Sequence, residues 1–107
     1  MVFNTGSALL DAIVLSVVSR DVNGTYGYRI TQEVRAVLDI SESTLYPVLR
    51  RLLKDECLET YDMAIDGRNR RYYRITENGR LQLNLYRGEW NVYAQKISGI
   101  LEEKDHE

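Results

Sequence analysis

Two hydrophobic periods divide the chain into helical and strand-like segments. Apolar residues recur at helical spacing in four segments, and in the first of them they fill almost every position. A helix without a polar face is typical of a segment buried in the centre of a fold or between subunits. Ser41 and Thr76 are suitable N-caps for the third and fourth segments. The pattern predicts helices over residues 7–19, 26–38, 41–55 and 77–103.

Between the third and fourth helices the period changes from helical to alternating. Tyr61, Met63 and Ile65 point to one side, as in a half-buried strand, and the alternation resumes over residues 70–75. The Asp66-Gly67 pair between them predicts a tight hairpin, because glycine tolerates a positive φ. Three helices, a hairpin and a long helix predict an α+β, mainly α fold, namely a winged helix-turn-helix with an added long C-terminal helix.

The third predicted helix has a core face and a polar face. Leu45, Val48, Leu49 and Leu52 share the core face. The opposite face and its flanks carry Ser43, Thr44, Tyr46, Pro47, Arg50, Arg51 and Lys54. Hydroxyls therefore lie near the start of this face and cations near its end. A DNA-recognition helix has this layout, since its first residues meet base edges while Lys and Arg meet phosphates. The alternative is an ordinary solvated helix face.

The hairpin is strongly cationic. Arg68, Arg70, Arg71 and Arg74 lie at its tip and along its returning strand, and residues 67–74 contain no acid. The wing of a winged helix lies along the DNA backbone or in the minor groove, where arginine pairs with phosphate. The alternative is an exposed edge strand that carries charge to prevent aggregation. The absence of intervening acids favours a wing.

Three segments of the chain resemble a known family. They are Tyr26-Gly27-Tyr28, the segment 43–52 with its Leu-Tyr-Pro sequence, and the segment 70–79. Over residues 8–80 these resemble the PadR family of bacterial transcriptional regulators, and the last helix is similar to that of the short PadR subgroup. The resemblance implies a homodimeric repressor whose DNA binding is loosened by an effector. By position, it implies operator contacts for Tyr28, Ser43, Thr44, Tyr46 and the hairpin arginines.

The resemblance also implies that the two ends of the chain have different roles. Residues 1–76 are expected to form the winged helix-turn-helix DNA-binding domain. Residues 77–107 are expected to form the C-terminal dimerisation helix and an acidic tail, and the two parts are expected to make one compact unit.

The last predicted helix carries a heptad seam, which is an apolar stripe with alternating intervals of three and four. Its members are Leu83, Tyr86, Trp90, Tyr93, Ile97 and Ile100. Such a stripe packs one helix against another at a shallow angle, and the expected partner is a second copy of the chain. A two-fold dimer would present two recognition helices about 34–36 Å apart, which matches one turn of duplex and a pseudo-palindromic operator.

Trp90 lies in the middle of the heptad seam. In the short PadR subgroup a tryptophan at a comparable place lines a flat cavity between subunits that stacks planar aromatic compounds. The resemblance therefore implies an effector site at Trp90, flanked by Tyr86 and Tyr93. The alternative is that Trp90 only anchors the dimer interface.

Net charge alone argues against a nucleic-acid partner, because the 107-residue chain carries −2. However, residues 1–101 carry a net charge of +1, and residues 102–107 carry −3. The acidic excess therefore belongs to the C-terminal tail. One cysteine cannot form an internal disulfide, which favours a reducing compartment. No apolar stretch approaches the length of a membrane span, so the expected location is the cytoplasm, with no membrane partner.

Catalytic and metal-binding residues are not apparent. His106 lies in the charged tail, and Cys57 is expected to be a small buried side chain rather than a nucleophile. No cluster has the spacing of a zinc site, and neither a cofactor nor an enzymatic activity is expected. Two alternatives to a DNA-binding regulator stay open: a protein–protein interaction module, and a small-molecule-binding protein that uses the same winged domain without DNA.

Overall fold

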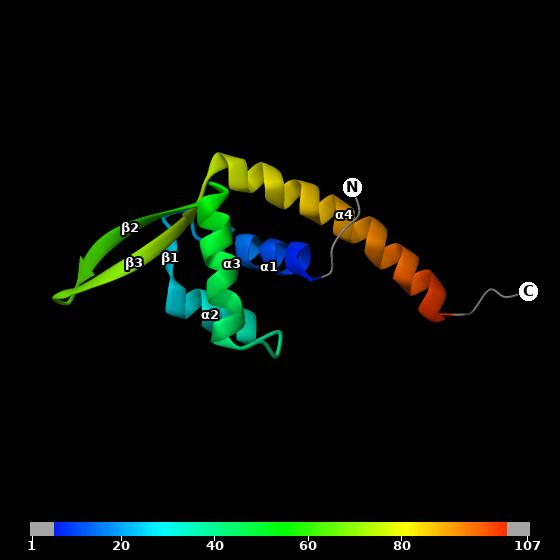
Figure 1. Cartoon of the computed structure of the whole chain (residues 1–107), viewed down its shortest axis with the longest axis horizontal. Helices are drawn as coiled ribbons and strands as arrows, with labels where there is room; N and C mark the ends of the chain where they lie inside the picture. Colours follow the sequence, from blue (N-terminus) through cyan, green and yellow to red (C-terminus); the bar gives the residue numbers. More distant parts are fainter. Residues whose placement is uncertain (1–5, 103–107) are drawn as a thin grey trace, which may run out of the picture.

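The computed structural model describes residues 6–102 as four helices and a three-stranded sheet (Figure 1). The elements in chain order are α1 (Ser7–Ser19), β1 (Thr25–Tyr26), α2 (Gly27–Arg35), α3 (Glu42–Lys54), β2 (Leu58–Ile65), β3 (Arg68–Ile75) and α4 (Glu77–Glu102). The predicted winged helix-turn-helix with a long C-terminal helix is therefore confirmed. Most of the predicted acidic tail, together with His106, lies outside the described residues.

Helix α1 forms the centre of the fold, as its nearly continuous apolar sequence predicts. It packs against α2, α3, α4 and strand β3. Val14, Leu15 and Val18 are completely buried in a core to which every helix contributes. A helix surrounded in this way has no solvent face, which explains why its polar residues are so few.

Helix α2 is shorter than the segment 26–38 that periodicity predicts. It ends at Arg35, and the next residues form a turn in which the N–H of Leu38 donates to the carbonyl of Val34 at 2.9 Å. The chain then reverses, and Ile40 packs against the core. A helix continued to Leu38 would carry the chain away from this position.

The sheet has a third strand that periodicity missed. Strand β1 contains two residues, with Thr25 opposite Tyr73 and Tyr26 opposite Tyr72, so the strand order is β1-β3-β2. Two residues are too few to show an alternating pattern. Just before β1, Gly24 has a φ of 94°, and a Cβ there would lie 2.7 Å from the carbonyl oxygen of Tyr73. Only glycine fits this close approach.

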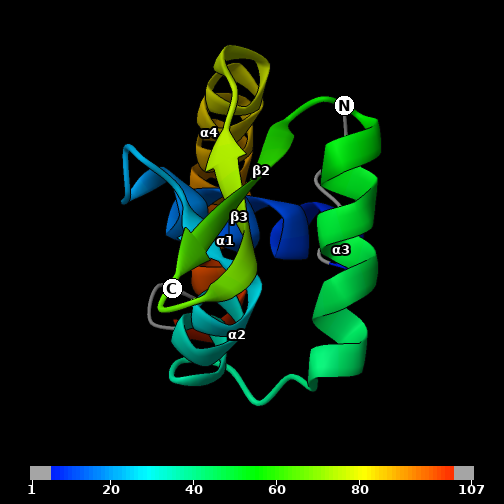
Figure 2. The same ribbon diagram turned by 90° about the vertical axis from the view of Figure 1, so that its left-hand side faces the viewer.

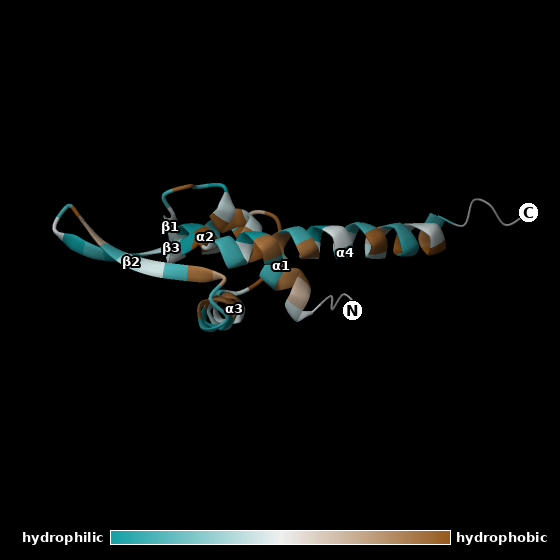
Figure 3. Ribbon diagram, turned by 90° about the horizontal axis from the view of Figure 1, so that it is seen from above, coloured by the Kyte–Doolittle hydropathy of each residue, from teal (hydrophilic) through white to brown (hydrophobic). Residues whose placement is uncertain are grey.

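The β2–β3 hairpin projects beyond the core (Figures 1 and 3). At its base Leu58 and Ile75 are buried opposite each other, whereas Met63 and Ile65 near the tip are exposed. The prediction of a half-buried strand through Ile65 is therefore wrong. Alternation predicts which residues share a face, but not whether anything covers that face. The predicted tight turn is confirmed by positive φ values of 53° and 78° at residues 66 and 67.

Helix α4 leaves the hairpin, crosses α1 and continues past it (Figure 1). The elongated molecule measures 66 × 27 × 21 Å along its principal axes. Figure 3 shows apolar residues on α4 beyond the end of α1. Leu83 is buried in the core, whereas Trp90 is 41% exposed and Ile100 is 68% exposed. The second half of the heptad seam is therefore partly or largely exposed within one chain.

The start of α4 is held by Thr76, whose predicted capping role is confirmed. Its hydroxyl accepts a hydrogen bond from the N–H of Gly79 at 2.9 Å and donates one to the carbonyl of Glu56 at 2.6 Å. We expect Thr76→Ala to lower the free energy of unfolding by about 1–2 kcal/mol, because an orphan helix N–H loses its acceptor. Urea unfolding measures this change. Thr76→Ser keeps the hydroxyl and is expected to retain most of the stability; equal destabilisation in both variants would contradict the capping role.

Candidate nucleic-acid interface

The polar face of α3 is open to solvent. Leu45, Val48, Leu49 and Leu52 are buried against the core, as the helical wheel predicts. The exposed residues are Glu42, Ser43, Thr44, Tyr46, Pro47, Arg50 and Lys54. Figure 2 shows α3 along one side of the molecule, with the hairpin beside it and α2 near its first residues. The polar face of α3 therefore lies on the surface of the molecule, beside the hairpin.

The first turn of α3 carries a cluster of hydroxyl groups. Ser41 occupies the predicted N-cap position, but its side chain makes no capping bond to the backbone. Its Oγ instead lies 2.9 Å from Ser43 Oγ and 3.0 Å from Thr44 Oγ1. Pro47 lacks an N–H, so the carbonyl of Ser43 receives no helical hydrogen bond from it. Exposed hydroxyls can donate to or accept from base edges and phosphates.

A cleft of about 470 Å³ separates the hairpin from α2 and α3. Its lining residues are Tyr26, Gly27, Tyr28, Tyr46, Arg68, Asn69, Arg70, Arg71 and Tyr73. A Cβ at Gly27 would lie 3.6 Å from the ring of Tyr73 and 3.8 Å from the ring of Tyr46. Burial raises the pKa of the Tyr73 hydroxyl. The floor of the cleft is therefore aromatic, and one wall carries three arginines.

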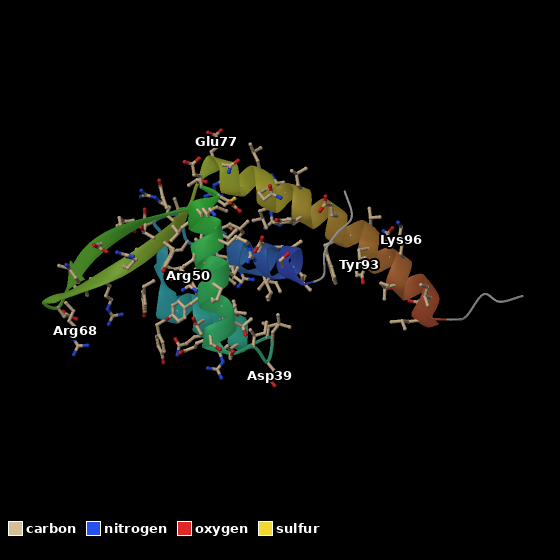
Figure 4. All side chains as sticks on the ribbon, in the orientation of Figure 1. Asp39, Arg50, Arg68, Glu77, Tyr93 and Lys96 are labelled. Carbon is tan, nitrogen blue, oxygen red and sulfur yellow. The ribbon has the colours of Figure 1, made fainter. Side chains whose placement is uncertain are left out.

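The hairpin arginines differ in how far they are neutralised. Figure 4 shows Arg68 at the hairpin tip and Arg50 on α3. Within the described part of the chain, the ion pairs of the hairpin join Arg71 to Asp62 at 3.7 Å and Arg74 to Glu59 at 2.8 Å. The guanidinium of Arg70 lies 4.8 Å from the centre of the Tyr26 ring. Exposed pairs of this kind are weak and are readily exchanged for a phosphate.

Arg51 lies apart from the other predicted site residues. Its guanidinium forms an ion pair with Asp11 of α1, on the side of α3 that faces the core. The Arg51 side chain is 38% exposed, and this ion pair directs its guanidinium toward α1. The DNA contact of Arg51 stays a prediction. The structure adds a partner on another helix, which a helical wheel cannot reveal.

Sequence reasoning missed the floor of the cleft. The sequence marks Tyr26 and Gly27 only as part of a family motif, and it gives no sign that Tyr73 lies beside them. The signal that could have found them is the aromatic-glycine pair at the start of α2, where a missing side chain lets two rings approach. Tyr28, a predicted site residue, is exposed at the mouth of the cleft, and its hydroxyl accepts from Gln32 Nε2 at 3.1 Å.

The heptad seam divides into two functional halves. Leu83 is buried in the core of its own chain, so it is not available to a partner. The reason is that α4 must first cover α1. Tyr86 is half-buried against that core, and its interface role stays a prediction. Trp90 and Tyr93 come next, with ring centroids 6.2 Å apart. Trp90 and Tyr86 line an apolar groove of about 460 Å³ between α1, α2 and α4, whereas Tyr93 does not.

Tyr86 connects α4 to the core through a hydrogen bond. Its hydroxyl donates to Asp11 Oδ2 at 3.3 Å. Burial, with the nearby Asp11 carboxylate, raises the pKa of Tyr86 to about 12. A tyrosine in the unfolded chain ionises near pH ~10.

This difference predicts an alkaline loss of stability. The folded chain holds the Tyr86 proton more tightly than the unfolded chain, so the free energy of unfolding is expected to fall as the pH rises from about 10 to about 12. Absorbance titration of phenolate should show a component that ionises at about pH 12 and disappears in Tyr86→Phe. A titration without such a component would contradict the contact.

No group of three or more metal-ligating side chains occurs within residues 6–102. Cys57 is buried, as predicted, and burial raises the pKa of its thiol, which makes it a poor nucleophile. None of the helices in this range is both long and apolar enough to cross a membrane.

Known proteins resemble the chain in sequence and in structure. Residues 14–85 match the model of the transcriptional regulator PadR-like family. Transcriptional regulator Rv3488 of Mycobacterium tuberculosis is 38% identical over 78 residues, which cover 72% of this chain and 73% of that protein. An uncharacterised protein of Lysinibacillus sphaericus is 40% identical over 99 residues, which cover 87% of this chain and 88% of that protein.

Solved structures extend the likeness to the whole fold. The crystal structure of smu.1704 from Streptococcus mutans covers 100% of this chain and 99% of its own, with 36% identity and a TM-score of 0.83. A PadR-like transcriptional regulator from Bacillus cereus covers 94% of this chain and 98% of its own, with 25% identity and a TM-score of 0.81. PadR proteins are DNA-binding transcriptional regulators and not enzymes. With its exposed recognition helix and arginine-rich wing, the chain belongs to the PadR-like family of transcriptional regulators.

Proposed function

We propose that the protein is a homodimeric repressor that binds a pseudo-palindromic operator and releases it when an effector binds. The observation that carries the DNA-binding part is the cleft between α3 and the hairpin. One wall presents Tyr28 of α2 and Tyr46 of α3, and the other presents Arg68, Arg70 and Arg71. The hydroxyls of Ser43 and Thr44 are exposed on the same helix as Tyr46. A duplex seated there would meet a base-reading helix and a phosphate-binding wing together.

The residues of this interface have two roles. Tyr28, Ser43, Thr44, Tyr46 and Pro47 surround the first half of α3, where they would reach base edges and thymine methyl groups. Arg50 and Lys54 on α3, with Arg68, Arg70 and Arg71 on the wing, would bind phosphates. Base contacts discriminate between sequences, whereas phosphate contacts strengthen binding to all of them.

The second copy of the chain would pack on the outer half of α4. Trp90, Tyr93, Ile97 and Ile100 continue the heptad seam beyond α1, and Ile100 is largely exposed within one chain. Covering these side chains would remove apolar surface from water. In this division, residues 1–76 bind DNA, and residues 77–107 dimerise.

The proposal is tested by selecting duplexes from a random-sequence DNA library with the wild-type protein. We expect the selected site to contain two inverted half-sites about one helical turn apart, and sedimentation to give a dimer that binds one duplex. With that site placed across a promoter, the protein should reduce transcription in vitro. If the protein selects no sequence and binds duplex DNA no better than an acidic globular protein does, the DNA-binding proposal is wrong. A protein-interaction module is then favoured.

The effector part of the proposal rests on Trp90. It is partly exposed, lies beside Tyr93 and lines the groove with Tyr86. A planar aromatic compound stacked there should quench its fluorescence, and Trp90 is the only tryptophan of the chain. Titration with a panel of such compounds should give saturable quenching together with weaker operator binding. Without any quenching, and with unchanged DNA affinity, Trp90 would be an interface anchor only.

A further inference from the structure

Asp11 is a buried carboxylate in a helix that is otherwise almost entirely apolar. It lies in the first half of α1 and is only 7% exposed. A carboxylate removed from water is costly unless each oxygen finds a donor. Its presence at the centre of the fold therefore calls for partners that satisfy both oxygens.

The two oxygens of Asp11 bind donors from two different helices. Oδ1 accepts a hydrogen bond from Nη2 of Arg51, which belongs to α3, and the two groups form an ion pair. Oδ2 accepts from the hydroxyl of Tyr86, which belongs to α4, at 3.3 Å. One carboxylate thus joins the recognition helix to the long C-terminal helix, with α1 between them.

This arrangement adds little to the stability of the fold, but it fixes the orientation of the helices that it joins. Apolar side chains of similar volume would usually stabilise a core at least as well as a buried ion pair. Apolar packing, however, tolerates small rotations and shifts, whereas a directed hydrogen bond to each oxygen does not. The pair therefore specifies how α3 is rotated and placed relative to α1 and α4.

Both donors lie next to surfaces of the proposed function. Arg51 follows Arg50, which is exposed on the proposed DNA-binding face of α3. Tyr86 lines the apolar groove together with Trp90. A small displacement of the Tyr86 hydroxyl would remove the donor to Oδ2 of Asp11 and leave the hydrogen bond from Arg51 to Oδ1 in place.

We propose that Asp11 is a positioning residue for DNA recognition, which holds the recognition helix α3 in register with α4 through Arg51 and Tyr86. The proposal rests on the proposed DNA-binding function, because α3 is positioned for the operator. It assigns no DNA contact to any of the three residues. A change at Tyr86, on the groove side, therefore alters the position of α3 without altering any residue on the DNA-binding face.

The test uses Tyr86→Phe in the full-length protein, because this change removes one hydroxyl and leaves the ring in place. Two quantities are measured: amide hydrogen exchange in residues 42–54, and the ratio of affinities for the duplex selected by the wild-type protein and for a scrambled duplex. We expect faster exchange in α3 and a ratio lowered by about 2- to 10-fold, which is the range expected for one hydrogen bond. Affinity for the scrambled duplex should not change, because phosphate contacts are intact.

Tyr61→Phe is the matched control. It also removes one tyrosine hydroxyl, whose partner is the carbonyl of Asn23 in the loop before β1. It is expected to leave exchange in residues 42–54 unchanged. Asp11→Asn should lower the ratio at least as much as Tyr86→Phe, and combining the two should add nothing, because the Tyr86 hydroxyl acts through Asp11.

The outcomes separate the inference from the function on which it rests. If Tyr86→Phe lowers the melting temperature but changes neither exchange in α3 nor the affinity ratio, the hydroxyl is merely structural and the proposal is overturned. Additive effects of Tyr86→Phe and Asp11→Asn would also overturn it. If the wild-type protein selects no DNA, the proposed function fails, and exchange in α3, which requires no DNA, still decides whether Asp11 couples the two helices.

Discussion

Replacing Arg68, Arg70 and Arg71 together with alanine is expected to weaken binding to every duplex, whatever its sequence. Each arginine bound to a phosphate releases counterions, so the slope of log affinity against log salt should become shallower by about 0.9 for each phosphate that is no longer bound. For three phosphates this gives a slope change of about 2.7 and an affinity about 100-fold weaker near physiological salt. Fluorescence anisotropy over a series of salt concentrations measures both quantities.

A charge-matched control is available on α4. The triple variant Arg80→Ala, Arg87→Ala and Lys96→Ala removes the same number of positive charges, three, from exposed positions on the other side of the core. This variant is expected to keep most of the salt slope, since its charges are not at the cleft. If affinity and slope fall equally in the two triple variants, the effect comes from net charge, and the wing has no special role. The ratio of specific to scrambled affinity should change little in either variant.

Gly79→Ala is expected to cost more than about 3 kcal/mol of unfolding free energy, or to prevent folding. A Cβ at this position would lie 2.1 Å from the carbonyl oxygen of Cys57 and 2.8 Å from Cγ1 of Ile75. That carbonyl also accepts the N–H of Thr76 at 3.1 Å, so it cannot move without breaking the junction between the wing and α4. The clash therefore outweighs the gain of about 1 kcal/mol that alanine normally brings to a helix.

Gly88→Ala, in the same helix, is expected to have the opposite effect and to stabilise the fold. No atom lies within 4 Å of the position that its Cβ would occupy. Only helix propensity then changes, and stability should rise by about 0.5–1 kcal/mol. Urea unfolding of both variants at one protein concentration measures the pair. A Gly79→Ala protein as stable as Gly88→Ala would show that α4 does not approach the hairpin base as described.

Periodicity succeeded where one element packs against a large neighbour. The core face of α3 and the central position of α1 follow from patterns of apolar residues, because a buried stripe or a buried helix requires apolar residues on every turn. The same patterns failed at the ends of elements. The end of α2 at Arg35 and the two-residue strand β1 depend on one or two local hydrogen bonds, which leave no periodic trace.

The candidate interface could be predicted residue by residue but not as a surface. Spacing and composition identify the exposed hydroxyls and cations on α3 and the hairpin. The cleft that brings Tyr28 and Tyr46 opposite the hairpin arginines, and the aromatic floor that Gly27 allows, depend on how α2, α3 and the hairpin pack. The burial predicted for the outer part of β2 was wrong. The alternating pattern continues through Met63 and Ile65, but nothing in the described chain covers these side chains.

The sequence by itself determined the order of the four helices and the hairpin, the family and the identity of the exposed basic residues, because these follow from local periods and motifs. Only the tertiary structure decided which polar residues are inside. On a helical wheel Arg51 is one more cation of the recognition helix, and Asp11 is an isolated acid on an apolar helix. They lie 40 residues apart in sequence and become partners because α1 and α3 pack together at that point. A buried charge is tolerated only where its counterpart meets it, and that meeting is a property of packing alone.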